Sequence, residues 1–171
     1  VGGSARLVSR LPEDRTKTGQ LFVLDGDAVV AGPFRCYGKS DNAAAREHGN
    51  WDEGAADPRD DTKPYGDHPY GEWTVTRIVE VVEADKLRTY GAFFIGVEPV
   101  MDPSDGLSDA ERRILNGGNG IGVHGGAAAA NGGLRPTYGC LRLSNDDLLS
   151  LVPHVLVGMG YTSEPPGNSR A

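Results

Sequence analysis

Glycine and proline interrupt this sequence so often that it has little room for long helices. The chain has 25 glycines and 11 prolines among 171 residues. Because both residue types favour tight turns and weaken helix interiors, this pattern predicts many short strands instead of a helical bundle. A chain of this length suits a single domain with a sizeable core, and we expect residues 1–171 to form one mainly β domain.

Short apolar runs predict the positions of the strands. Residues 21–24 and 28–31 flank an Asp-Gly step, which is typical of a hairpin, and the extended run continues to residue 37. β-Branched residues fill the longest run, 73–82, and residues 90–97 are its expected partner. A shorter strand is expected at residues 121–124.

Capping signals predict one or two short helices. Ser108 precedes Glu111 by three residues, which is the spacing of a capping box. Ser144 starts a second helix, which Pro153 ends or bends because proline removes a backbone donor. Residues 162–171 are polar and contain proline, so we expect a flexible tail there.

A long acidic segment separates the predicted strands. Residues 40–67 are rich in Asp, Asn, Gly and Ala, and we interpret them as a loop or lid inserted into the domain. Asp57, Asp60 and Asp61 are expected to be solvated surface, with cation binding by this loop as the alternative.

Charge and composition exclude several classes of partner. The net charge of −7 argues against binding to nucleic acid or to an anionic lipid surface. No apolar stretch approaches the roughly 20 residues of a membrane span, and no secretory signal is visible, so we expect a soluble chain without membrane insertion.

The spacings of His48, His68 and His154 do not resemble a metal site, and a solvated loop accounts for His48 and His68. We predict no metal and no cofactor.

A histidine and a cysteine, sixteen residues apart, are the candidate catalytic pair. His124 follows an apolar run, and Cys140 precedes a second predicted helix. A free thiol is mostly protonated at neutral pH, and a nearby imidazole overcomes this by accepting its proton. The positive end of the following helix would also favour a thiolate. This pairing predicts acyl transfer through a cysteine.

The residues around this pair resemble the signature of the L,D-transpeptidase catalytic domain, also called the YkuD domain. The signature is His124-Gly125, a spacer, and then the segment from Thr137 to Leu143. Weaker matches occur at residues 37–39, 68–73 and 145–148, so the resemblance covers about residues 20–157. It implies a β-sandwich-like fold and action on the stem peptides of bacterial peptidoglycan, hence a periplasmic, extracellular or cell-wall location.

The resemblance also implies roles for the individual residues. Cys140 is the nucleophile and His124 its base. Backbone N–H groups around Gly139 and Cys140 are candidates for the oxyanion hole, and Gly125 belongs to the same candidate site. Thr137 fits the serine or threonine of the family, whereas Tyr138 stands where many members have a second histidine. A contact expected from that histidine is therefore made differently, or by the phenol.

Several alternatives remain open from the sequence. Arg142 either holds a substrate carboxylate through its planar fork or braces loop carbonyls. The thioester is resolved by an amine, as in a transpeptidase, or by water, as in an L,D-carboxypeptidase or amidase. A hydrolase of this kind could be an antibacterial toxin with a cognate immunity protein, and a wall-binding module without turnover is a further alternative. Cys36 is expected in the core, although pairing with Cys140 is open.

Overall fold

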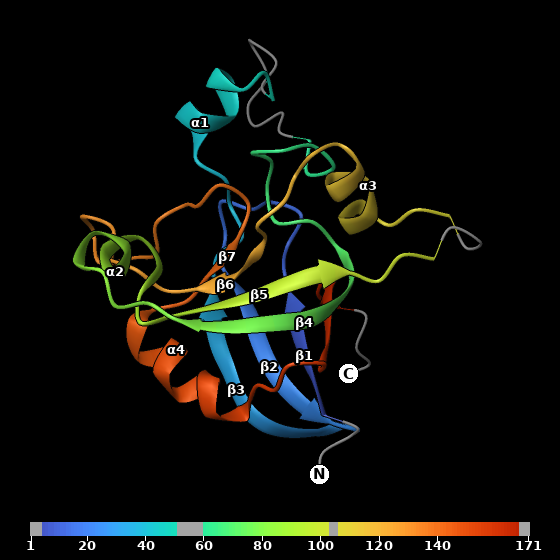
Figure 1. The fold of residues 1–171 in the computed structure, drawn as a ribbon, viewed down its shortest axis with the longest axis vertical. Helices are drawn as coiled ribbons and strands as arrows, with labels where there is room; N and C mark the ends of the chain where they lie inside the picture. Colours follow the sequence, from blue (N-terminus) through green and yellow to red (C-terminus); the bar gives the residue numbers. More distant parts are fainter. Residues whose placement is uncertain (1–4, 51–59, 103–105, 168–171) are drawn as a thin grey trace.

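The computed structural model describes residues 5–50, 60–102 and 106–167, and its chain is mostly β (Figure 1). Its strands form one sheet of eight with the order β3-β2-β1-β8-β4-β5-β6-β7. The strands are β1 (Ala5–Arg10), β2 (Gly19–Asp25), β3 (Ala28–Cys36), β4 (Gly71–Glu80), β5 (Phe93–Pro99), β6 (Gly122–His124), β7 (Leu141–Arg142) and β8 (Gly160–Glu164). The helices are α1 (Asn42–Glu47), α2 (Ala84–Tyr90), α3 (Asp109–Leu115) and α4 (Asn145–Leu151), which a 3-10 turn, Val152–His154, extends.

The predicted strand pairs are confirmed. In the hairpin of β2 and β3, Asp25 lies opposite Ala28, and Gly26 takes the positive φ of 62° that its turn requires. Strands β4 and β5 pair antiparallel, as expected from their β-branched and aromatic residues. Strand β5 begins at Phe93, three residues later than predicted, because Tyr90 is the last residue of α2 and Gly91 is its C-cap.

Three strands, β1, β7 and β8, lie where the sequence predicted none. Strands β1 and β8 pair in parallel in the middle of the sheet, and β8 also pairs with β4. The prediction of a flexible tail is therefore wrong for residues 162–164, where Ser163 is buried and the Leu11 N–H donates to Glu164 O (2.9 Å). The core consequently extends beyond residues 20–157. Residues 168–171 of the predicted tail lie outside the described residues.

The two edges of the sheet meet beside Cys140. Tyr37, just after β3, and Arg142 in β7 exchange backbone hydrogen bonds of 3.0 Å in both directions. The sheet therefore curls back on itself, and β4 and β5 cross in front of β1–β3 in Figure 1. Buried side chains from both halves, including Leu7, Leu21 and Ile95, form one core between them. This arrangement confirms the sandwich-like expectation.

Both predicted helix starts are confirmed. Ser108 and Glu111 form the capping box of α3, and the Ser144 side chain accepts from the third residue of α4. Helices α1 and α2 were not predicted. Helix α1 lies inside the supposed loop, where Asp41 caps an alanine-rich turn, so the loop prediction is wrong for residues 42–47. No helix in the described part of the chain has the length and apolar character to cross a membrane.

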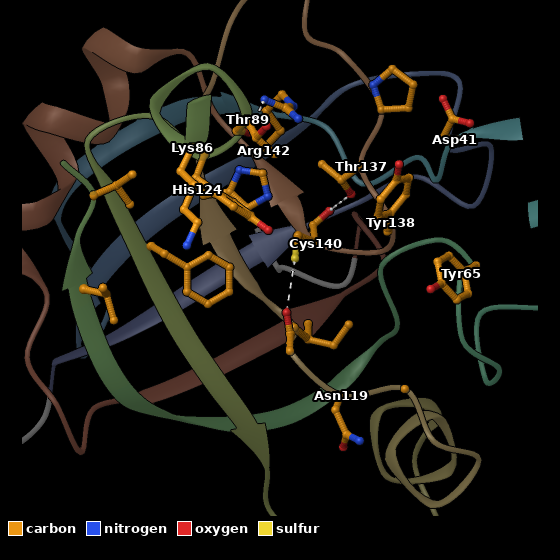
Figure 2. Close-up of a pocket in the computed structure, with 18 of the residues that line it drawn as sticks. Asp41, Tyr65, Lys86, Thr89, Asn119, His124, Thr137, Tyr138, Cys140 and Arg142 are labelled. Carbon is orange, nitrogen blue, oxygen red and sulfur yellow. Dashed lines mark hydrogen bonds between the residues drawn. The ribbon is translucent and has the colours of Figure 1, made fainter. Parts of the chain in front are cut away.

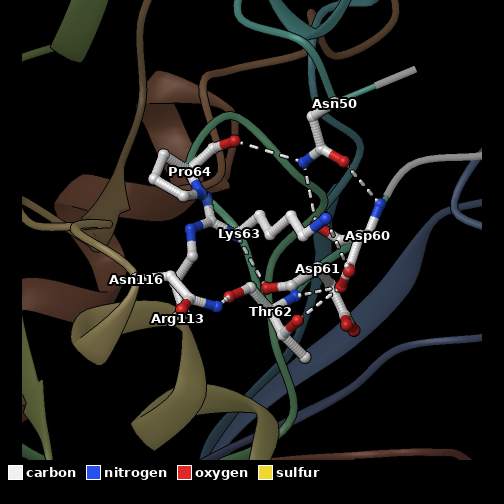
Figure 3. Close-up of polar contacts among 8 residues, drawn as sticks. All are labelled: Asn50, Asp60, Asp61, Thr62, Lys63, Pro64, Arg113 and Asn116. Carbon is white, nitrogen blue, oxygen red and sulfur yellow. Dashed lines mark hydrogen bonds and ion pairs between the residues drawn. The ribbon is translucent and has the colours of Figure 1, made fainter.

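Within the 40–67 segment, the described residues Asn50 and 60–67 are tied to the domain by polar contacts (Figure 3). Asn50 is buried and pairs with the backbone of Asp60 in both directions (2.8 and 2.9 Å). The Asp60 carboxylate in turn accepts from the Thr62 N–H (2.9 Å). Arg113 of α3 donates to Asp61 O (2.9 Å). The aspartates here are thus parts of an ordered turn; Asp57 lies outside the described residues.

Candidate active site

The two predicted catalytic residues reach the same pocket from adjacent strands. Strands β6 and β7 pair in parallel, with His124 opposite Arg142. Because side chains alternate between faces, Cys140, which lies directly before β7 and two residues from Arg142, projects from the same face as His124. Both side chains line a pocket of about 830 Å³ (Figure 2).

His124 is held as a neutral base. Its Nδ1 lies 2.8 Å from Gly125 O, and because a carbonyl can only accept, Nδ1 carries the proton and Nε2 keeps its lone pair. Burial lowers the pKa of His124 to about 4, with Arg142 and Arg135 adding to the effect. The ring packs edge-on against Tyr90 at 5.0 Å, which restricts its orientation.

The Cys140 thiol is also neutral in this state. Burial raises the pKa of the thiol to about 11, against the lowering effects of the Gly122 amide and of Arg113. The sulfur lies 3.5 Å from Gly120 O, and the described residues include no hydrogen bond between it and His124. The expectation of a helix-stabilised thiolate is therefore wrong. The start of α4 lies instead at the histidine loop, where Asn145 Oδ1 accepts from the Gly126 N–H (2.8 Å).

Thr137 fixes the turn that carries the cysteine. Its hydroxyl donates to Cys140 O (2.8 Å) and accepts from the Gly139 N–H (3.0 Å). The amide of Gly139 is therefore not a free oxyanion donor, contrary to the expectation for this residue. The Cys140 N–H, by contrast, has no acceptor among residues 5–50, 60–102 and 106–167.

Only a glycine fits at position 139 without strain. It has a φ of 119°, and a Cβ on it would lie 1.9 Å from the Arg113 guanidinium. Arg113 is 1% exposed, and its Nη2 donates to Tyr138 O (3.2 Å) and Gly66 O (3.2 Å). This arginine thus ties the cysteine turn to the 60–67 segment. The role of Arg113 could not be predicted from the sequence, because an arginine on a short polar helix is expected to be exposed to solvent.

His68 is a second residue whose role the sequence analysis missed. The prediction that it lies in a solvated loop is wrong, because its side chain is fully buried. Its Nδ1 lies 2.9 Å from Gly139 O, and its Nε2 lies 2.7 Å from the Tyr161 hydroxyl. His48, in contrast, is exposed as expected and stacks on Tyr65 at 3.7 Å.

Arg142 and Gly125 support the histidine. Arg142 is 3% exposed, and its Nη1 donates to Gly125 O and to Thr89 O (3.2 Å for the second). Of the two roles left open for Arg142, these contacts favour bracing of loop carbonyls. Gly125 also uses its N–H, which donates to Tyr90 O (2.7 Å). Both backbone groups of Gly125 are thereby engaged, so it positions His124 and supplies no oxyanion donor.

Tyr138 and Arg77 shape the open side of the pocket. Tyr138 is 65% exposed, and its ring lies 5.7 Å from that of Tyr65, on the wall opposite His124 (Figure 2). Arg77 of β4 lies over the Phe94 ring at 5.3 Å and lowers the pKa of Cys140 electrostatically. Arg77 has no carboxylate partner in the part of the chain that the structure describes.

The second cysteine is remote from this chemistry. Cys36 is fully buried in the core, as expected, and burial raises the pKa of its thiol to about 12. Both cysteines are free, so the structure contains no Cys36–Cys140 disulfide.

Comparison with known proteins identifies the family. The family model "L,D-transpeptidase catalytic domain" (YkuD) matches residues 9–162. No curated protein matches the chain. Bd1075 of Bdellovibrio bacteriovorus has a similar fold, with a TM-score of 0.53 at 14% identity over 93% of this chain and 47% of Bd1075. L,D-transpeptidase 1 of Mycobacterium tuberculosis gives a TM-score of 0.44 at 14% identity over 94% of this chain and 62% of that protein.

An L,D-transpeptidase from Mycobacterium smegmatis is comparable, with a TM-score of 0.45 and 15% identity over 93% of this chain and 58% of its own. The chain thus spans about half to three-fifths of the length of these proteins. At these identities, the likeness to Bd1075 supports the fold alone. The family match covers most of the chain, and by it the protein belongs to the L,D-transpeptidase catalytic domain (YkuD) family.

Proposed function

We propose that this protein is a cysteine acyltransferase that acts on peptidoglycan stem peptides through a thioester on Cys140. The observation that carries the proposal is the projection of a neutral imidazole and a thiol into one pocket from paired strands. The family supports the substrate class. Transpeptidation is the leading outcome.

The protonation states favour a mechanism in which attack and proton transfer occur together. Rotation about the Cα–Cβ bond turns the Cys140 sulfur, within the pocket, from Gly120 O toward His124. The thiol proton then passes to Nε2 of His124 as the sulfur bonds to the substrate carbonyl carbon. The carbonyl oxygen becomes an oxyanion, for which the free N–H of Cys140 is the proposed donor. Collapse breaks the C–N bond, and His124 returns the proton to the leaving amine.

The second half of the reaction decides the type of enzyme. An acceptor amine gives its proton to His124 and attacks the thioester carbonyl, and the Cys140 thiol then leaves, which completes transpeptidation. Attack by water instead gives a carboxylic acid, as in an L,D-carboxypeptidase or amidase. Both routes use the same residues and differ only in what enters the pocket from its Tyr138 side.

Arg77 is the proposed contact for a substrate carboxylate, in place of Arg142. The Arg142 guanidinium faces backbone carbonyls, whereas that of Arg77 borders the pocket against an aromatic ring. Stem peptides carry carboxylates, and an arginine without a carboxylate partner suits them.

Peptidoglycan as substrate implies that the protein acts on the periplasmic or extracellular side of the cell membrane. If it acted there as a toxin, the producing cell would need a cognate immunity protein.

Incubation with tetrapeptide-bearing muropeptides tests the proposal. Mass spectrometry of the products is expected to detect dimers or exchanged terminal D-amino acids for transfer, and loss of the terminal residue alone for hydrolysis. Cys140→Ala should abolish either activity, whereas Cys36→Ala should retain it because Cys36 lies in the core. Full activity of the Cys140→Ala variant would refute the thioester mechanism.

A further inference from the structure

A buried chain of hydrogen bonds connects strand β1 to the cysteine turn. Ser9 Oγ lies 2.7 Å from the Tyr161 hydroxyl, which lies 2.7 Å from Nε2 of His68. His68 Nδ1 in turn lies 2.9 Å from Gly139 O. The side chains of Ser9, His68 and Tyr161 are fully buried, and none of them lines the pocket.

The direction of every proton in this chain follows from the last acceptor. Gly139 O can only accept, so Nδ1 of His68 carries the proton and Nε2 is an acceptor. The Tyr161 hydroxyl therefore donates to Nε2, and Ser9 donates to Tyr161. Burial lowers the pKa of His68 to about 3, which keeps the ring neutral and this pattern unchanged across the neutral pH range.

Locking the Gly139 carbonyl also sets the direction of the Cys140 amide. In a planar trans peptide, the C=O and the following N–H point in opposite directions. Because Gly139 O faces the buried His68, the Cys140 N–H faces away from it, and Cys140 is the residue of this pair that lines the pocket. The preceding amide, Gly139 N–H, is already bound to Thr137.

We infer that His68 is a positioning residue that holds the Cys140 N–H in place as an oxyanion donor, with the Tyr161 hydroxyl holding the His68 ring through its hydrogen bond to Nε2. The inference rests on the proposed thioester chemistry. A donor held in place before reaction stabilises the tetrahedral oxyanion without reorganisation, and removal of one such donor slows acyl transfer by about 100-fold or more. Loss of the His68 contact should therefore slow acylation of Cys140.

Two reactions of the same thiol separate this role from a merely structural one. Acetyl transfer from p-nitrophenyl acetate passes through a tetrahedral oxyanion, whereas alkylation by iodoacetamide displaces iodide without one. We expect Tyr161→Phe and His68→Leu to slow acetylation by about 10- to 100-fold. Their alkylation rates should stay within about 3-fold of the wild-type rate, because neither side chain lines the pocket that contains the thiol. The background rate of each reaction, measured with the Cys140→Ala variant, is subtracted from the rate of every other variant.

Two further variants serve as controls. His68→Asn keeps an N–H donor at the Nδ1 position and should restore at least part of the acetylation rate. Tyr70→Phe removes a different inward-facing hydroxyl, one that donates to Leu11 O (2.6 Å), and should change neither rate. Parallel changes in acetylation and alkylation, or no change in either, would overturn the inference.

Failure of the proposed function gives a distinct result. If wild-type Cys140 accepts no acetyl group, the thioester chemistry is rejected, and the crystal structure of His68→Leu, which lacks the contact with Gly139 O, decides the positioning role by itself. A rotated Gly139–Cys140 peptide supports it. An unrotated peptide overturns it.

Discussion

Two buried neutral histidines are expected to make this protein less stable as the pH falls below about 6.5. Burial lowers the pKa of His68 to about 3 and that of His124 to about 4, whereas both rings titrate near 6.5 in the unfolded chain. Below pH 6.5 the unfolded state therefore binds protons that the folded state does not. The free energy of unfolding therefore has its full value above pH 6.5 and decreases as the pH falls toward the pKa values of the two rings in the folded state.

The size of the effect follows from the proton difference. Each histidine lowers the free energy of unfolding by about 1.4 kcal/mol per pH unit once the unfolded ring is protonated. Between pH 6.5 and pH 4.5 this amounts to about 2 kcal/mol for His68. Asp61 acts in the opposite direction, because burial raises the pKa of its carboxyl to about 6, so its protonation stabilises the folded state over the same range.

Comparison with a His68→Asn variant isolates the histidine, because the Asp61 and His124 contributions are common to both proteins. Urea denaturation at several pH values between 4.5 and 7.5 gives the free energy of unfolding of each. We expect the wild-type protein to lose about 2 kcal/mol more than the variant between pH 6.5 and pH 4.5. Equal losses would mean that His68 titrates normally, which would refute its burial as a neutral ring.

Further predictions concern the pocket and the cysteine turn. Gly139→Ala should abolish acylation and destabilise the fold, because its Cβ would meet Arg113; unchanged activity and denaturation midpoint would contradict the geometry. Thr137→Val should slow acylation by about 10-fold, whereas Thr137→Ser should retain most of it, as measured by acyl-enzyme formation. Arg77→Gln should raise KM for stem peptides by about 10-fold with little change in stability, and the matched change Arg112→Gln on α3 should leave KM unchanged. An unaltered KM in Arg77→Gln would exclude Arg77 as the carboxylate contact.

The strands that carry strong local signals could be predicted from the sequence. The Asp-Gly turn and the β-branched run defined β2–β5, and N-terminal serine caps defined α3 and α4. Strands β1, β7 and β8 were missed. Strands β1 and β8 pair with each other across most of the chain length, and β8 has an inward-facing Ser163 where an apolar residue is usual. Strand β7 has only two residues, too few for a periodic pattern. Tertiary pairing therefore decided their structure.

The candidate catalytic pair was predictable, but the groups that hold it were not. Cys140 and His124 stand in a recognisable local pattern, and strand pairing then brings them to one face. His68 and Arg113 act through backbone carbonyls at residues distant in sequence, Gly139 for the first and Tyr138 for the second. Such contacts depend on how segments cross in three dimensions, and no spacing in the sequence encodes them.

The proposed function depends on a thioester between Cys140 and the substrate carbonyl. Intact-mass analysis of the protein, with the reaction stopped in acid shortly after mixing with a tetrapeptide stem, detects this thioester. We expect a mass increase equal to the acyl fragment without its leaving residue, which peptide mapping assigns to Cys140 and which is absent in Cys140→Ala. Stem-peptide turnover by the wild-type protein with an unmodified Cys140, or with the acyl group on another residue, would contradict it.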